Sequence, residues 1–130
     1  MGWAGFQELY KKGKFNIRLL ARDSRKNHKM LDSYAGDPSV TVVWGDLMCY
    51  EDVLAGVSGA DYVLHVGGMV SPAADYYPDR TLKVNVTAAE NVAKAVMAQP
   101  DSDKVKVVYI GSVAQYGDRN PPYHWGSADE

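Results

Sequence analysis

Short stretches of apolar residues alternate along this chain with segments in which apolar positions recur every three or four residues. Residues 15–21, 40–44, 62–66 and 106–110 are apolar and rich in β-branched side chains, a pattern that predicts buried strands. The periodic segments predict helices at 6–12, 24–34, 50–57 and 79–97, with Gly13 ending the first and Ser24 capping the second. Strands and helices that alternate in this way predict an α/β fold with a parallel sheet.

The predicted helix at 79–97 is the longest element and has one apolar side. That side consists of Leu82, Val86, Ala89, Val92, Ala93 and Val96, which follow a three- and four-residue spacing. We expect this side to face the core. Before the helix, residues 67–78 are rich in glycine, serine and proline and predict a loop long enough to be functional.

Composition and charge restrict the possible classes of function. The chain has 130 residues, 46% of them hydrophobic, which suits one domain over residues 1–130. Its net charge of −2 gives no electrostatic basis for binding nucleic acid or an acidic membrane, and no apolar run is long enough to span a bilayer. The only cysteine, Cys49, cannot form an internal disulfide, so we expect a cytoplasmic protein. Residues 117–130 are polar and non-periodic and predict an irregular tail.

The strand predicted at 106–110 leads into a motif that can carry chemistry. Its sequence is Gly111-Ser112-Val113-Ala114-Gln115-Tyr116-Gly117. A buried parallel strand that ends in a small residue and a serine delivers a hydroxyl to the carboxyl edge of the sheet, where α/β proteins bind ligands. Ser112 is therefore the candidate catalytic residue. The alternative is that a small residue only lets the chain turn at the end of the strand.

Five local motifs follow one another in the order found in a known family. They are Leu20-Ala21-Arg22-Asp23, Trp44-Gly45-Asp46-Leu47, Val63-Leu64-His65-Val66-Gly67-Gly68, Asn85-Val86-Thr87-Ala88-Ala89-Glu90-Asn91 and the motif around Ser112. Over residues 17–117 the chain resembles the extended short-chain dehydrogenase/reductase family, which comprises NAD(P)-dependent sugar-nucleotide epimerases and dehydratases and reductases of the dihydroflavonol type. The resemblance implies a Rossmann-type parallel sheet, with flanking helices, that binds a dinucleotide cofactor.

Two parts of the family pattern are missing. The family begins with a strand and a Gly-x-x-Gly-x-x-Gly turn, whereas here Gly2 and Gly5 have the first spacing and Glu8 occupies the third position. Beyond the serine the family has a Tyr-x-x-x-Lys pair, but Tyr123 is followed four residues later by Ser127. We therefore expect an incomplete Rossmann-type sheet, without its first strand and glycine-rich turn, in a chain truncated at both ends.

The resemblance assigns cofactor contacts to residues near the strand ends. Asp46 would accept a hydrogen bond from adenine and Leu47 would pack on the ring, or Asp46 would instead cap the next helix. Gly67 and Gly68 would let the backbone approach a ribose or the pyrophosphate, or would form a flexible turn. Asn85 would order backbone and water near the serine, or would join its helix to the sheet by a hydrogen bond.

Arg22 stands where NAD-preferring members of the family carry an acidic residue. A guanidinium at this position favours the 2′-phosphate of NADP, and the basic residues of the helix that follows add positive charge. NAD is the alternative cofactor, because Arg22 could belong to a solvated basic face and Asp23 could neutralise it. His65 lies inside an apolar strand and resembles a packing position. No set of residues has the spacing of metal ligands, so we expect no metal site.

The strand order of the family predicts unpaired edges in this chain. In the doubly wound order 3-2-1-4-5 the first strand is central, so its absence leaves the strands at 15–21 and 62–66 each with an open apolar edge. Three outcomes are possible. The two strands pair with each other, a second chain fills the gap and makes a homo-oligomer, or the chain holds its shape only marginally.

These observations predict part of an NAD(P)-dependent oxidoreductase, epimerase or dehydratase that acts on a small molecule of the carbonyl or nucleotide-sugar type. Arg22 and the Gly-Gly-Met-Val-Ser-Pro loop favour the reductase-like branch. Without the tyrosine and lysine, Ser112 can orient a ligand but cannot perform acid–base catalysis, so we expect no activity from this chain alone. The alternative is a non-catalytic sensor that binds a dinucleotide without turning it over.

Overall fold

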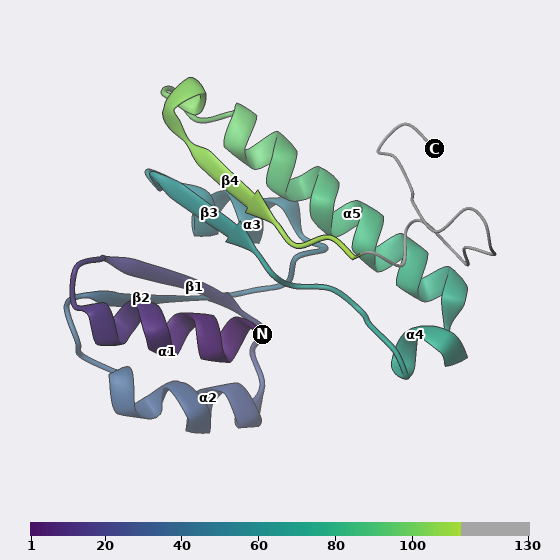
Figure 1. Cartoon of the computed structure of the whole chain (residues 1–130), viewed down its shortest axis with the longest axis horizontal. Helices are drawn as coiled ribbons and strands as arrows, with labels where there is room; N and C mark the ends of the chain where they lie inside the picture. The colour runs from purple at the N-terminus through teal and green to yellow at the C-terminus, as the bar shows by residue number, and fades with distance from the viewer. Residues whose placement is uncertain (113–130) are drawn as a thin grey trace, which may run out of the picture.

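The computed structural model describes residues 1–112 and has an α/β architecture of helices and parallel strands (Figure 1). The strands are β1 (Ile17–Ala21), β2 (Val40–Trp44), β3 (Tyr62–His65) and β4 (Lys106–Tyr109). The helices are α1 (Gly2–Lys12), α2 (Arg25–Leu31), α3 (Tyr50–Val57), α4 (Ala73–Tyr76) and α5 (Pro78–Met97), with short 3-10 turns η1 (Asp32–Tyr34) and η2 (Ser102–Lys104). The α/β class expected from the sequence is confirmed, whereas the predicted tail at 117–130 lies outside the described residues.

The four strands form two separate parallel pairs. β1 pairs with β2 in the register Ile17 to Val40, and β3 pairs with β4 in the register Tyr62 to Lys106. All four strands run in the same general direction in Figure 1. The orders β2-β1 and β3-β4 are those that a doubly wound sheet has on either side of its central strand. The outcome in which the strands at 15–21 and 62–66 pair with each other is therefore wrong.

The core connects the two strand pairs. Its buried members are Val53 and Val57 of α3 and Val92, Ala95 and Val96 of α5. Side chains from both pairs, Leu20 of β1 and Val63 of β3, pack against this same cluster. Both pairs are thus connected by side-chain packing on the α3–α5 layer, and in the described residues β1 and β3 do not pair with each other.

Within residues 1–112, the inner edges of β1 and β3 carry backbone groups that no neighbouring strand pairs with. The N–H of Ile17 donates to Ser39 (2.7 Å) and the carbonyl of Ala21 accepts from Gly45 (3.0 Å), so alternate residues of β1 face β2. The residues between them, Arg18 and Leu20, direct their N–H and C=O groups to the opposite side. Such edges are templates for pairing with another strand.

A second, aromatic cluster attaches α1 to η1. Phe6 is 4% exposed and lies edge-on to Tyr34, with ring centroids 4.8 Å apart. Trp3 and Tyr10 flank Phe6 on the same helix. The Tyr10 hydroxyl donates to Asp37 Oδ2 at 2.7 Å, and this hydrogen bond raises the pKa of Tyr10. The cluster holds α1 in place independently of the α3–α5 core.

The apolar side predicted for the long helix is partly wrong. Leu82 and Val86 are 68% and 46% exposed, whereas Ala88 and Asn91, outside the predicted side, are buried. The buried face includes Val92, Ala95 and Val96, which pack with residues of α3 in the core cluster. The loop predicted at 67–78 contains the short helix α4. Among residues 1–112, no helix is long and apolar enough to cross a membrane.

Candidate functional site

The predicted site residues follow the carboxyl ends of the four parallel strands. Arg22 comes directly after β1, and Asp46 and Leu47 follow β2. Gly67 follows β3, and Ser112 lies three residues beyond Tyr109, the last residue of β4. The strands run in the same general direction in Figure 1, so their carboxyl ends point to one edge of the fold. That edge is where open α/β sheets bind ligands.

Leu47 and Gly67 are brought into direct contact. A Cβ atom built on Gly67 would lie only 2.5 Å from Leu47 Cδ1, so only glycine fits there without moving the leucine. The carbonyl of Leu47 accepts a hydrogen bond from Asn91 Nδ2 of α5 at 2.8 Å, which attaches the Leu47 backbone to α5. The glycine therefore lets the end of β3 approach the loop after β2.

Asn85 clamps the loop that follows β3. Its Oδ1 accepts from the N–H of Met69 (2.8 Å) and its Nδ2 donates to the carbonyl of Met69 (3.0 Å). A Cβ on Gly68 would lie 3.0 Å from Asn85 Oδ1, so the glycine makes room for this clamp. Through these contacts Gly68 and Asn85 have a structural role, because they link α5 to the loop after β3. Their predicted contacts with a cofactor remain predictions.

Asp46 shapes the turn between β2 and α3. Its Oδ1 accepts from the N–H of Met48 at 2.8 Å, and its own N–H donates to Asp52 Oδ2 at 2.9 Å. The N-cap of α3 is Cys49, so Asp46 stabilises the turn rather than capping the helix itself. Asp46 is exposed, and its second carboxylate oxygen accepts no hydrogen bond within the described residues. That oxygen can accept from an amine.

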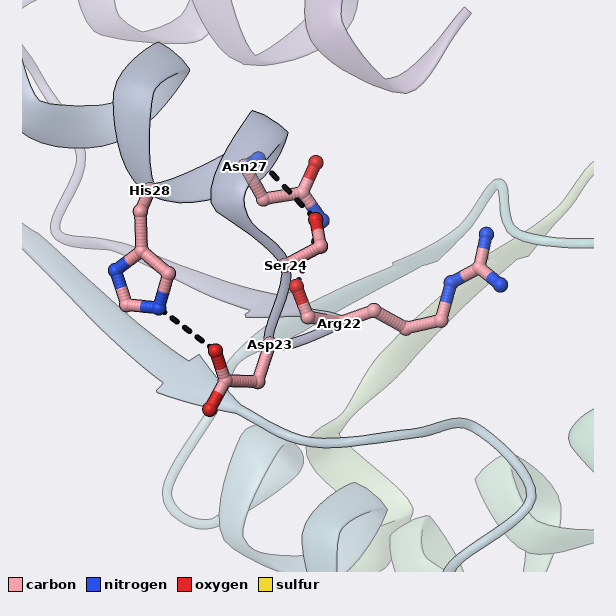
Figure 2. Close-up of polar contacts among 5 residues, drawn as sticks. All are labelled: Arg22, Asp23, Ser24, Asn27 and His28. Atoms are coloured by element: carbon pink, nitrogen blue, oxygen red, sulfur yellow. Dashed lines mark hydrogen bonds and ion pairs between the residues drawn. The ribbon is translucent and has the colours of Figure 1, made fainter.

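Arg22 and Asp23 have different surroundings although they are adjacent (Figure 2). Asp23 Oδ1 lies 2.8 Å from His28 Nε2, while the Arg22 side chain extends away from both residues. No ion pair within residues 1–112 involves the Arg22 guanidinium. Ser24 Oγ accepts from the N–H of Asn27 at 3.2 Å, which confirms the predicted cap of α2. Arg22 thus presents an exposed cation at the end of β1.

Ser112 is exposed and is the last residue that the structure describes. The remainder of its motif, residues 113–117, and the positions Tyr123 and Ser127 lie outside the described residues. His65, in contrast, is only 7% exposed and stacks on Tyr109 with ring centroids 5.4 Å apart. Burial lowers the pKa of His65, which favours its neutral form. These contacts are those of a packing residue.

Two features were not predicted from the sequence. The helix α1 begins at Gly2 rather than at residue 6, so Gly2 and Gly5 both lie inside it, and a Cβ on Gly2 would lie 3.2 Å from Val66 Cγ2. His28 stacks on Trp44, with ring centroids 3.9 Å apart. The sequence does contain a signal for the earlier start of α1. The segment between Gly2 and Gly13, the residue that ends the helix, is long enough for a complete helix. Nothing local in the sequence indicates the second contact.

The residues present fit the adenosine half of a dinucleotide. Arg22 would offer a cation to a ribose phosphate, Asp46 would offer an acceptor to an amine, and Leu47 would offer an apolar surface to a ring; these roles remain predictions. The close contact between Leu47 and Gly67 holds that surface against the neighbouring strand end. Among residues 1–112, no three histidine, cysteine, aspartate or glutamate side chains are placed to hold a metal ion.

The strand order and the position of the site define an α/β protein of the dinucleotide-binding type. The family model described as "NAD dependent epimerase/dehydratase family" matches residues 1–129. The chain belongs to this family.

Similar proteins cover different shares of the chain. UDP-glucose 4-epimerases of Rickettsia massiliae (strain Mtu5) and Rickettsia canadensis (strain McKiel) are 30% and 32% identical over 82 residues, which is 62% of this chain and 24% of each relative. The chain therefore spans 24% of the length of these curated relatives. An X-ray structure of Pen from Bacillus thuringiensis has a TM-score of 0.76 at 22% identity, covering 89% of this chain and 35% of that chain. This last similarity shows the fold alone.

Replacing Gly67 by alanine is expected to weaken the binding of NADP and NAD equally. The new Cβ would displace Leu47, and if Leu47 packs on the adenine ring as predicted, loss of about one methylene of contact corresponds to a roughly fourfold lower affinity. Calorimetric titration measures both affinities. Gly5→Ala is the control, because a Cβ there meets nothing within 4 Å. Unchanged affinities in Gly67→Ala would show that Leu47 does not support the ring.

Proposed function

We propose that this chain forms a cofactor-binding region that prefers NADP and belongs to an enzyme acting on a nucleotide-sugar or other carbonyl-type substrate. The exposed Arg22 carries the NADP preference, because a guanidinium forms charge-assisted bonds with phosphate. The pairing of Asp23 with His28 supports this preference, since Asp23 is not paired with Arg22 in the described residues. The family description names NAD, which is the alternative cofactor.

The substrate class is supported by similarity. The relatives named UDP-glucose 4-epimerase favour a nucleotide sugar over the dihydroflavonol-type carbonyl that the loop after β3 suggested. A bound nicotinamide supplies a site for accepting and returning hydride. Ser112 would donate a hydrogen bond to an oxygen of the substrate and so orient it. Asp46 and Leu47 would hold the adenine at the other end of the cofactor.

Catalysis needs a proton-transfer group beside the serine. After Ser112 the sequence contains no Tyr-x-x-x-Lys, because the residues four positions after Tyr116 and Tyr123 are Asn120 and Ser127. We propose that the residues of this sequence bind the dinucleotide. The second candidate function is a sensor that binds the dinucleotide without reaction.

The proposal is tested by calorimetric titration of the purified chain with NADP and with NAD. We expect NADP to bind about tenfold more tightly than NAD, the equivalent of one good charge-assisted contact. Absence of binding by either dinucleotide would overturn the proposal. Incubation with NADP or NAD and UDP-glucose distinguishes the two candidate functions, because turnover would exclude a sensor that binds without reaction.

Self-association through the open strand edges is part of the proposal. The inner edges of β1 and β3 are unpaired in the described residues, and Tyr62 and Leu64 of β3 are 65% and 48% exposed. We expect dimers to form with increasing concentration in sedimentation velocity experiments. Leu64→Lys should weaken the dimer at least about tenfold, because a charge on an edge strand opposes pairing. Lys83→Gln, on the exposed side of α5, is the control, and a wild-type chain that stays monomeric would contradict the proposal.

A further inference from the structure

Asn91 is a polar residue on the buried face of α5. It is 7% exposed and shares that face with Ala88, Val92 and Ala95, which are also buried. Its Nδ2 donates to the carbonyl of Leu47 at 2.8 Å, in the turn between β2 and α3. A buried amide needs such a partner, whereas an apolar side chain at this position would need none. The presence of an amide here therefore points to an effect on Leu47.

Leu47 lies where two halves of the fold meet. β1 and β2 form the first half with α3, which contacts both strands, and β3 and β4 form the second half with α5, which lies between them in the sequence. Leu47 belongs to the first half. It contacts the second through its side chain at Gly67 and through its carbonyl at Asn91. The hydrogen bond from Asn91 thus joins the two halves at the edge where the strands end.

The turn after β2 is also held by hydrogen bonds that do not involve Asn91. The N–H of Gly45 donates to the carbonyl of Ala21 at 3.0 Å, and the N–H of Asp46 donates to Asp52 Oδ2 on α3 at 2.9 Å. Both bonds stay within the first half. Loss of the Asn91 amide should therefore leave the turn intact while releasing it from α5.

The same helix also holds the loop after β3. Asn85 accepts from the N–H of Met69 and donates to its carbonyl. Two amide side chains of α5 thus hold the backbone of the loops after β2 and β3, which belong to different halves. Through these bonds α5 determines how far apart the two loops lie.

We infer that Asn91 is a positioning residue that sets the spacing between the loop after β2 and the loop after β3. This inference rests on the proposed binding of a dinucleotide. In that proposal the adenosine half of the cofactor contacts side chains that follow β1 and β2, and the remainder reaches the loop after β3. Asn91 should then affect the binding of the whole dinucleotide and not that of its adenosine half.

Asn91→Ala is tested by calorimetric titration with NADP and NAD and with their adenosine halves, adenosine 2′,5′-bisphosphate and AMP. We expect the variant to bind the dinucleotides roughly fivefold more weakly, the equivalent of one ordinary hydrogen bond, and to bind the adenosine halves as the wild type does. A structural role alone would not separate the two kinds of ligand. Equal weakening of a dinucleotide and its half, or no weakening of either, would overturn the inference.

Gln99→Ala is the matched control. Gln99, just after α5, also bonds to the backbone of a distant loop, because its Oε1 accepts from the N–H of Gly59 at 3.1 Å. Gly59 precedes β3 and so lies at the opposite end of the strand from the site. Gln99→Ala should leave all four affinities unchanged. A loss of dinucleotide affinity as large as that of Asn91→Ala would overturn the inference.

A measurement on the wild type covers the case in which Asn91→Ala does not fold. Coupling between two equilibria is reciprocal, so a dinucleotide whose binding depends on the bond between Asn91 and Leu47 also stabilises that bond. Hydrogen exchange of the Asn91 side-chain amide, followed by NMR, should slow when NADP binds and keep its rate with adenosine 2′,5′-bisphosphate. An unchanged rate with NADP, or equal slowing by both ligands, would overturn the inference.

The same titrations separate failure of the inference from failure of the proposed function. If the wild type binds a dinucleotide and Asn91→Ala binds it equally well, the inference fails and the proposed function stands. If the wild type binds none of the four ligands, the proposed function fails, and the inference fails with it.

Discussion

Replacement of Arg22 by glutamine is expected to weaken NADP binding about ten- to a hundredfold and to leave NAD binding little changed. A charge-assisted contact with a phosphate contributes about 1.5–3 kcal/mol, which corresponds to this range of affinity. Arg22 is exposed and has no ion pair within residues 1–112, so its loss breaks no salt bridge of the described protein. Titration calorimetry with both dinucleotides, together with thermal melting to verify the fold, measures the effect.

The control for this prediction is Lys26→Gln, which removes one positive charge from the next helix. If Arg22 touches the 2′-phosphate, its replacement should act on NADP alone and far more strongly than the control. An equal loss of affinity for NADP and NAD in Arg22→Gln would place the arginine at the pyrophosphate or make it structural. No loss in either would remove it from the site.

Replacement of Phe6 by alanine is expected to destabilise the protein by about 3–5 kcal/mol, the usual cost of removing a buried phenylalanine side chain. Phe6 is 4% exposed and contacts the rings of Trp3, Tyr10 and Tyr34. The change therefore removes the centre of the cluster that attaches α1 to η1. Urea unfolding followed by circular dichroism measures the free energy of unfolding.

Phe15→Ala is the matched control for Phe6→Ala. Phe15 is 44% exposed in the segment between α1 and β1, so its loss should change stability by less than about 1 kcal/mol. If both variants lose the same stability, the aromatic cluster does not secure α1. A normal free energy of unfolding for Phe6→Ala would lead to the same conclusion.

Local patterns predicted the elements well where the residues determine their own conformation. The bounds of β2 and α3 agree with the prediction, because apolar β-branched runs and periodic segments have distinct spacings. Gly13, with φ of 60°, ends α1 as expected for a residue in the left-handed region. Ser24 caps α2 through its hydroxyl.

The errors concern contacts between distant parts of the chain. Spacing alone identified an apolar side of α5, but its buried face depends on where α3 packs, and Leu82 remains exposed. The same limit applies to the site. Sequence placed Arg22 and Leu47 at strand ends, whereas the contact between Leu47 and Gly67 and the stack of His28 on Trp44 arise only from the fold.

The separation of the strands into two pairs has a consequence for ligand binding. A dinucleotide that reaches from Arg22 to Ser112 would touch the ends of both pairs, which are otherwise connected through the shared helix layer. Part of the binding free energy would then be used to fix the spacing of the two halves, which lowers the observed affinity. Because the ligand would bind both strand pairs of the folded protein, it would stabilise the folded state. The melting temperature should therefore rise with ligand concentration.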